Sequence, residues 1–200
     1  MPERLPRLAR LEGKVAIVTG AGSSGEGIGN GKATAVLFAR EGAKVLLVDM
    51  VKERAEETLA MIHEEEGEAS LFQADVTSAA DCRRMVETAM ERYGRLDILD
   101  NNVGVSQRGT VLDVSEEDWD RILTINIKTM VQASKAAIPL MIESGGGGAI
   151  INISSIAGLR AHSSTPYSVS KAGVIGLTFS MAADHAKDNI RVNCIAPGLL

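Results

Sequence analysis

The chain has 200 residues, of which 45% are hydrophobic, and its formal net charge at pH 7 is −5. This length and composition are sufficient for one globular domain with a buried core. The acidic balance provides no positive surface for nucleic acid or for an anionic membrane, so neither is an expected partner. The two cysteines and three histidines are scattered along the chain, so we expect reduced cysteines and no metal site.

The predicted elements alternate between strands and helices. Strands are predicted where short runs are apolar and β-branched, and helices where helix formers are bounded by capping residues. In chain order, the sequence predicts a strand at 14–19, a helix at 31–41, a strand at 43–49, a helix at 51–66, a strand at 69–74, a helix at 78–92, a strand at 96–99, a helix at 115–142, a strand at 149–153, a helix at 166–187 and a strand at 190–195. Pro139 should kink the long helix or end it early.

Six apolar strands that alternate with five helices indicate an α/β fold, a doubly wound parallel sheet with helices on both faces in three layers. Right-handed crossovers favour the strand order 3-2-1-4-5-6 of the Rossmann fold. No linker or repeat divides the chain, so residues 1–200 are expected to form a single domain. Ligands of such a sheet bind at the carboxyl ends of its first and fourth strands.

A glycine-rich loop joins the first strand to the first helix. Its glycines are Gly20, Gly22, Gly25, Gly27, Gly29 and Gly31. Glycines in this place let the backbone approach a pyrophosphate, and the helix N-terminus supplies amides and partial positive charge. The strand, loop and helix together therefore predict dinucleotide binding, and the alternative is a merely flexible loop.

Two acidic residues end the second and third strands. Asp49 has the position expected of a carboxylate that accepts hydrogen bonds from the adenosine ribose. A 2′-phosphate would meet its negative charge, so NAD is predicted over NADP, although Lys52 and Arg54 are close enough to weaken that preference. Asp75 and Val76 are similarly placed for the adenine. The alternative for both acidic residues is that they cap the helices that follow.

Tyr167 and Lys171 are four residues apart in the last predicted helix, so their side chains lie on the same face. A phenol and an ammonium in this arrangement can share one ligand and one proton. A Tyr/Lys pair at this spacing is by itself typical of a solvated helix face. Its interpretation therefore depends on the motifs elsewhere in the chain.

Taken together, the motifs resemble those of the short-chain dehydrogenase/reductase family in its single-domain form, from about residue 11 onward. Each one falls at the expected end of a strand or on the expected helix. The matching motifs are Thr19-Gly20 with its glycine loop, Asp75-Val76, Asn101-Asn102-Val103-Gly104, Asn126, Ser155, Tyr167 with Lys171, and Pro197-Gly198.

The resemblance implies how the catalytic work is divided. Tyr167 would be the general acid/base, and Lys171 would bind the nicotinamide ribose and favour the phenolate form of the tyrosine. Ser155 would hydrogen-bond the substrate oxygen, and Ser154 would support the backbone, because neighbouring strand residues point to opposite faces. Asn126 would help to hold a water in the proton relay.

The resemblance also implies the cofactor contacts. They are Gly20, Ser23, Gly29, Gly31, Asp49, Asp75, Val76, Asn102, Val103, Gly104, Tyr167, Lys171, Pro197 and Gly198. The glycine loop is longer than usual, and matching it from Gly29 onward without a gap puts an insertion of about five residues within 23–28. The alternative match, through Gly27 and Gly29, needs a gap in the helix start. Val103 replaces a more usual alanine and adds bulk beside the cofactor.

The function expected from these motifs is that of an oxidoreductase that transfers a hydride between NAD and a small-molecule secondary alcohol or ketone. Two alternatives remain open. One is an NADPH-dependent reductase of 3-oxoacyl or other carbonyl substrates, and the other is a cofactor-binding protein without turnover. His162, in the loop before Tyr167, is a candidate substrate contact.

Further expectations concern the assembly and completeness of the protein. The family normally continues beyond Pro197-Gly198, so the resemblance implies that the substrate lid and the last strand are missing. It also implies a homotetramer or homodimer packed through the helices at 115–142 and 166–187. The reduced cysteines and the lack of an apolar N-terminal run indicate a cytoplasmic protein.

Overall fold

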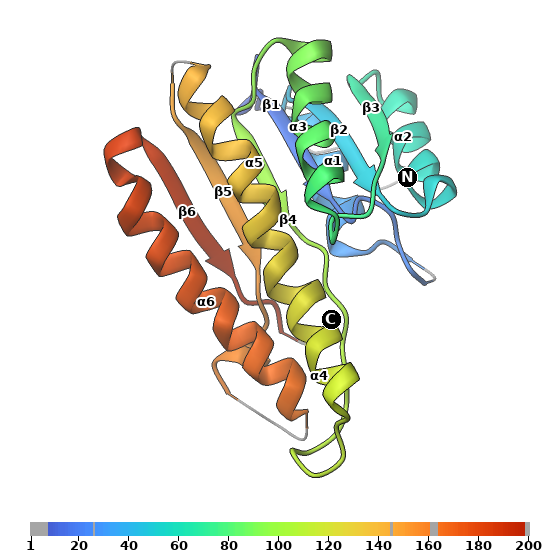
Figure 1. Ribbon diagram of the computed structural model, residues 1–200. Helices are drawn as coiled ribbons and strands as arrows, with labels where there is room; N and C mark the ends of the chain where they lie inside the picture. The colour runs from blue at the N-terminus through green and yellow to red at the C-terminus, as the bar shows by residue number, and fades with distance from the viewer. Residues whose placement is uncertain (1–7, 26, 145, 161–163, 199–200) are drawn as a thin grey trace.

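The sheet has six parallel strands in the order β3-β2-β1-β4-β5-β6 (Figure 1). The computed structural model describes residues 8–25, 27–144, 146–160 and 164–198. The strands are Val15–Thr19 (β1), Lys44–Asp49 (β2), Ala69–Gln73 (β3), Ile98–Asn101 (β4), Gly148–Ile153 (β5) and Ile190–Ile195 (β6). The predicted doubly wound sheet and its strand order are therefore confirmed.

Every predicted helix is present, with ends within two residues of the expected positions. The helices are Asn30–Arg40 (α1), Lys52–Glu64 (α2), Ala79–Tyr93 (α3), Glu116–Leu123 (α4), Thr129–Glu143 (α5) and Thr165–His185 (α6), with short helical segments at Thr124–Lys128 (η1), Ile156–Gly158 (η2) and Ala186–Asp188 (η3). In the part of the chain that the structure describes, no helix combines the length and the apolar character needed to cross a bilayer.

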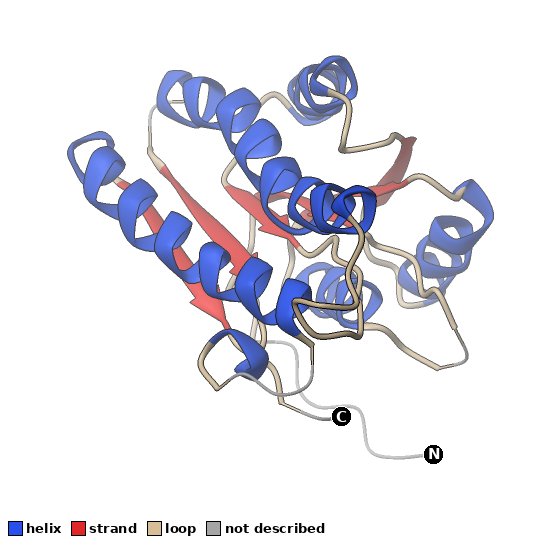
Figure 2. Ribbon diagram, turned by 60° about the horizontal axis from the view of Figure 1, so that its bottom comes forward, coloured by secondary structure: helices blue, strands red, loops and turns tan. Residues whose placement is uncertain are grey.

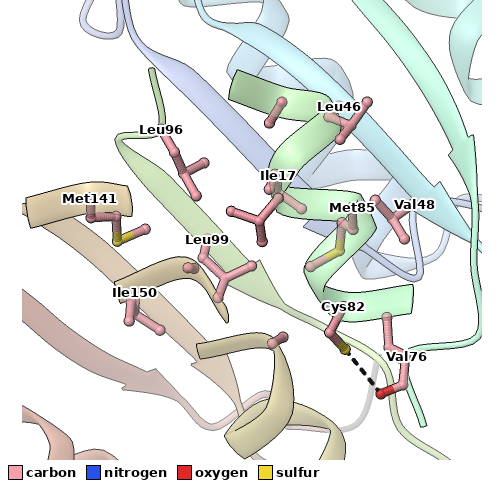
Figure 3. Close-up of a cluster of buried hydrophobic side chains, with 14 of the residues drawn as sticks. Ile17, Leu46, Val48, Val76, Cys82, Met85, Leu96, Leu99, Met141 and Ile150 are labelled. Atoms are coloured by element: carbon pink, nitrogen blue, oxygen red, sulfur yellow. Dashed lines mark hydrogen bonds between the residues drawn. The ribbon is translucent and has the colours of Figure 1, made fainter. Parts of the chain in front are cut away.

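The sheet separates two hydrophobic clusters, because alternate side chains of a strand point to opposite faces. Ile17 and Leu99 pack with residues of α3, α5 and α6 in the larger cluster, whereas Val18 and Leu47 pack with α1 and α2. Figure 3 shows the larger cluster, in which Ile17 lies beside side chains of α3. Figure 2 shows the same elements turned by 60°. The three predicted layers are thus present.

The long helix predicted at 115–142 consists of α4, the π-helical η1 and α5 in succession. In η1 the backbone N–H of Thr129 donates to the carbonyl of Thr124, five residues earlier. The prediction that Pro139 ends this helix early is wrong, since α5 continues to Glu143. Pro139 is exposed, so its ring lies on the solvent side of the helix and not in the core.

The fourth strand differs slightly from its predicted position. It begins at Ile98 rather than at Leu96, whose backbone N–H bonds to the Ser144 hydroxyl. It ends at Asn101, so the polar run that follows starts at the carboxyl edge of the sheet. This edge is where ligands of doubly wound sheets bind.

Candidate active site

A cavity of about 310 Å³ lies at the carboxyl edge of the sheet, beside the first turns of α6. It is lined by Asn30, Asn102, Gly104, Val105, Ser106, Ile153, Ser154, Ser155, Tyr167, Lys171, Pro197 and Gly198. This volume is at the lower end of the range for small-molecule sites. Of the predicted site residues, the lining includes Asn102, Gly104, Ser155, Tyr167, Lys171, Pro197 and Gly198.

Tyr167 and Lys171 meet at this cavity. The Lys171 Nζ atom lies 5.8 Å from the centroid of the Tyr167 ring and donates a hydrogen bond of 2.8 Å to the Ile153 carbonyl. Lys171 is only 3% exposed, and this burial lowers its pKa to about 8, against a small opposing effect of Cys194. The ammonium group is therefore fixed beside the phenol by a bond to the end of β5.

The two neighbouring serines of the cavity have different partners. The Ser154 hydroxyl donates to the Lys171 carbonyl at 2.7 Å and is buried, so it ties β5 to α6. The Ser155 hydroxyl accepts a hydrogen bond of 3.1 Å from the Ala157 N–H at the start of η2. Ser155 thus retains its own hydrogen for a further acceptor at the cavity.

Gly158 is a positioning residue that the sequence interpretation missed. A Cβ atom at this position would lie 2.6 Å from the Lys171 carbonyl carbon and 2.7 Å from its oxygen. The backbone of η2 therefore packs directly on that of α6 at Lys171. The run of small residues after Ser155, Ala157-Gly158, was the available signal, because small residues permit close backbone approach.

Asn126 lies behind the cavity and does not line it. Its Nδ2 atom donates to the Val105 carbonyl at 3.0 Å and to the Ser170 hydroxyl at 2.8 Å, and its Oδ1 atom accepts from the Val105 N–H at 2.8 Å. The side chain is fully buried in the η1 turn. Asn126 therefore ties the loop after β4 to α6, and its part in a water relay stays a prediction. Ser170, its partner, was not predicted.

The glycine loop packs against the end of β4. A Cβ atom at Gly31 would lie within contact distance of the Gly20 carbonyl oxygen and of Asn102 Nδ2. Gly20 has a φ of 64°, which favours glycine. The Ser23 hydroxyl accepts a hydrogen bond of 2.8 Å from the Gly29 N–H, which closes the longer part of the loop. The first turn of α1 thereby reaches the cavity, where Asn30 lines the wall.

Asp49 holds the glycine loop and the start of α2 together. Its Oδ2 atom accepts from the Gly22 N–H at 3.0 Å, and its Oδ1 atom accepts from the Val51 N–H at 2.9 Å. Of the two cations near it in sequence, Lys52 forms an ion pair of 2.9 Å with Glu56. Arg54 is exposed and has no side-chain partner within the described ranges.

The predicted adenine contacts lie farther from the cavity. Asp75 is exposed and accepts a hydrogen bond of 2.9 Å from the Thr77 N–H, whereas the α3 cap is Ser78. The Val76 side chain belongs to the hydrophobic core, beside Cys82 (Figure 3), and Val103 packs against the same cluster. The structure therefore does not bring these two side chains into the cavity.

Two expectations remain, the substrate contact of His162 and the lack of a metal site. His162 lies outside the described residues. Across those residues, no three His, Cys, Asp or Glu side chains form a group that could hold a metal ion.

Comparison with known proteins gives matches along nearly the whole chain. The family model for short chain dehydrogenase matches residues 14–200. The 3-oxoacyl-(acyl-carrier-protein) reductase FabG of Thermotoga maritima is 38% identical over 192 residues, which are 96% of this chain and 76% of that protein. The meso-2,3-butanediol dehydrogenase of Serratia marcescens is 36% identical over 192 residues, 96% of this chain and 73% of that protein. The crystal structure of a short chain dehydrogenase from Mycobacterium smegmatis superposes with a TM-score of 0.92 at 33% identity, covering 100% of this chain and 81% of that one.

Proposed function

The chain belongs to the short-chain dehydrogenase family of oxidoreductases, and we propose that it transfers a hydride between NAD and a secondary alcohol or its ketone, with Tyr167 as the general acid/base. The observation that carries the proposal is the meeting of Tyr167, Lys171 and Ser155 at one cavity. The close contact of the Gly31 backbone with Gly20 and Asn102 supports a fit for the dinucleotide, because the lack of a side chain at Gly31 lets the glycine loop lie directly on the first turn of α1.

The proposed chemistry assigns proton handling to the chain's own residues. The cofactor, when bound, supplies the hydride acceptor or donor. The Ser155 hydroxyl donates to the substrate oxygen and orients it toward Tyr167. Tyr167 removes the hydroxyl proton in oxidation and returns it in reduction. The Lys171 ammonium, held by the Ile153 carbonyl, stabilises the negative charge on the phenolate.

An activity panel tests this proposal. Secondary alcohols of increasing size are offered with NAD, and the matching ketones with NADH, while the absorbance of the reduced cofactor is followed. We expect turnover with at least one alcohol and its ketone. NADH binding without turnover on any substrate would instead support a cofactor-binding protein that does not catalyse the reaction.

The preference for NAD is proposed to depend on Asp49. Replacing it by the isosteric amide, Asp49→Asn, should tighten NADPH binding by about tenfold relative to NADH, since two like charges at close range cost about 1 to 4 kcal/mol near a protein surface. Within the described part of the chain Arg54 has no competing side-chain partner, so it could then pair with the 2′-phosphate. Fluorescence titration of both cofactors measures the ratio of their dissociation constants.

Asp75→Asn is the matched control, because it removes an exposed carboxylate two residues after the neighbouring strand β3. It should leave the NADPH to NADH ratio of dissociation constants unchanged. Tighter binding of NADPH than of NADH by the unmodified protein would contradict the role given to Asp49.

The second candidate function is NADPH-dependent reduction of a 3-oxoacyl substrate. It is favoured by the 38% identity to the 3-oxoacyl-(acyl-carrier-protein) reductase of Thermotoga maritima and by the exposed guanidinium of Arg54, which no described residue pairs. Comparing kcat/KM for a 3-oxoacyl thioester with NADPH and for a simple ketone with NADH separates the two candidates. A higher value for the thioester with NADPH would favour this second function.

We also propose that the protein forms a homodimer or homotetramer through α5 and α6, which run along the same face of the sheet (Figure 1). Apolar side chains on these helices remain exposed, among them Phe179 at 71% and Val169 at 44%. Phe179→Glu should shift the protein to monomers, because it places a charge in the interface. Sedimentation velocity measures the shift.

Leu37→Glu is the control for the assembly experiment, since Leu37 is apolar, 51% exposed and lies on α1, which covers the opposite face of the sheet from α6. This variant should retain the assembly of the unmodified protein. A monomeric unmodified protein, or an equal effect of both variants, would exclude the α6 interface.

The cellular location is proposed to be the cytoplasm, which is supported by the two free cysteines, Cys82 and Cys194. The interpretation of residues 1–200 as one dinucleotide-binding domain stays a prediction.

A further inference from the structure

Asp100 is an acidic residue in the middle of the parallel sheet. It lies in β4 between Val18 of β1 and Ile151 of β5, and its side chain is completely buried. Among the residues that the structure describes, neither of its carboxyl oxygens has a hydrogen-bond partner. An ionised carboxylate in such surroundings is strongly disfavoured, so the group is expected to carry a proton.

The elements packed on β4 supply no compensating charge. Neither β1 nor β5, both fully described, contains a titratable side chain. The charged residues of α5, Lys135 and Glu143, are exposed and lie on the helix that covers the opposite face from Val18. On α1, Lys32 is paired with Glu57 and Arg40 with Glu65, and Asp97, just before β4, is paired with Arg95. Burial alone therefore raises the pKa of Asp100, to about 7.

The backbone of Asp100 is tied to the glycine loop. Its carbonyl oxygen accepts a hydrogen bond of 3.1 Å from the Thr19 hydroxyl, which in turn accepts one of 3.1 Å from the Asn102 N–H. Asn102 Nδ2 then donates to the Gly20 carbonyl at 3.2 Å. Asn102 also lines the cavity. A displacement of β4 at Asp100 would therefore move the wall of the cavity and the glycine loop together.

We propose that Asp100 is a proton-linked positioning residue: its protonated side chain is accommodated in the buried sheet, whereas its ionisation there loosens the end of β4 and weakens cofactor binding. The inference rests on the proposed function only in taking the cavity as the cofactor site. The charge state of Asp100 acts on the cavity through Thr19 and Asn102, since the Asp100 side chain itself does not line the cavity.

The direction of the pH effect follows from proton linkage. An aspartate in an unfolded chain has a pKa near 3.9, and Asp100 in the folded protein has a pKa raised to about 7. The folded protein therefore holds an additional proton between these values, and its stability falls as pH rises from about 4 to about 7. Above about pH 7 the ionised form dominates, and we expect cofactor affinity to fall there.

The test compares NADH dissociation constants from about pH 6 to about pH 9 for the unmodified protein, Asp100→Asn and Asp100→Val. A single linked proton limits the effect to about tenfold per pH unit above the pKa. We expect the NADH affinity of the unmodified protein to fall with rising pH above about pH 7 at a rate that approaches this limit. The affinities of the two Asp100 variants should lack this additional fall. Asp97→Asn, which removes a paired carboxylate beside the same strand, should retain the unmodified profile.

Parallel profiles for the unmodified protein and the Asp100 variants, with NADH binding intact, would overturn this inference alone. Absence of NADH binding at every pH would overturn the proposed function as well. If the variants do not fold, ¹³C NMR of the aspartate carboxyl groups in the unmodified protein decides: one carboxyl must titrate near neutral pH, and its absence would refute the inference.

Discussion

Tyr167→Phe should lower kcat/KM for a secondary alcohol by about a thousandfold, within the range of about 10²- to 10⁴-fold that general acid–base catalysis contributes. The substitution keeps the aromatic ring beside Lys171 Nζ and removes only the hydroxyl group. The dissociation constant for NADH should therefore change by less than about twofold, because the binding surface is nearly preserved. Steady-state kinetics and fluorescence titration measure the two quantities separately.

Tyr93→Phe is the natural control, since Tyr93 and Tyr167 are the only two tyrosines of the chain. The Tyr93 hydroxyl lies in α3, bonds to the Ser70 hydroxyl at 2.6 Å and does not line the cavity. Its loss should cost about 1 kcal/mol of unfolding free energy and leave kcat/KM unchanged. Activity that survives Tyr167→Phe would remove this tyrosine from the proton transfer.

Gly31→Ala should weaken NADH binding by on the order of a hundredfold. The added Cβ atom would collide with the Gly20 carbonyl oxygen and with Asn102 Nδ2, so the glycine loop and the end of β4 must separate. Overpacking of this kind costs about 1 to 3 kcal/mol, and about 1.4 kcal/mol corresponds to a tenfold change in affinity. Fluorescence titration with NADH measures the loss.

Gly25→Ala provides the comparison within the same loop, because a Cβ atom at Gly25 would meet no atom of the described residues, its chain neighbours aside, within 4 Å. Its NADH affinity should equal that of the unmodified protein. If both alanine variants bound NADH as tightly as the unmodified protein, close approach at Gly31 would not be required for cofactor binding. If both variants lost NADH affinity equally, cofactor binding would be sensitive to any side chain added to the loop, and the loss could not be assigned to the contact at Gly31.

The fold was predictable because a parallel sheet covered on both faces requires continuous apolar strands. Val15–Thr19, for example, is buried at every residue, and its apolar run ends at the glycine that starts the loop. The spacing of Tyr167 and Lys171 was equally informative, since residues four apart on a helix share a face. Local sequence thus predicted the strands and placed Tyr167 beside Lys171, whereas the strand order followed from the right-handedness of the crossovers.

Features that depend on contacts between distant segments were not predictable in this way. The bond between Asn126 and Ser170 joins residues 44 positions apart, and it depends on how α6 crosses η1. Gly158 matters because η2 packs on the α6 backbone, which its sequence neighbours do not reveal. The early end predicted at Pro139 was wrong because the exposed helix face there tolerates a proline, and the alternative prediction of a kink stays a prediction.

The π turn that carries Asn126 has a consequence for the angular phase of the long helix. An α-helix advances by about 100° per residue, so its two halves normally share one phase. The turn closed between Thr124 and Thr129 holds one additional residue, which shifts α5 relative to α4. The side chain of Asn126 can therefore bond to the loop after β4 while Ala133 and Ala137 pack in the core against the sheet. In an uninterrupted α-helix, the orientation of α4 would fix that of α5, so one rotation of the whole helix would have to satisfy both contacts.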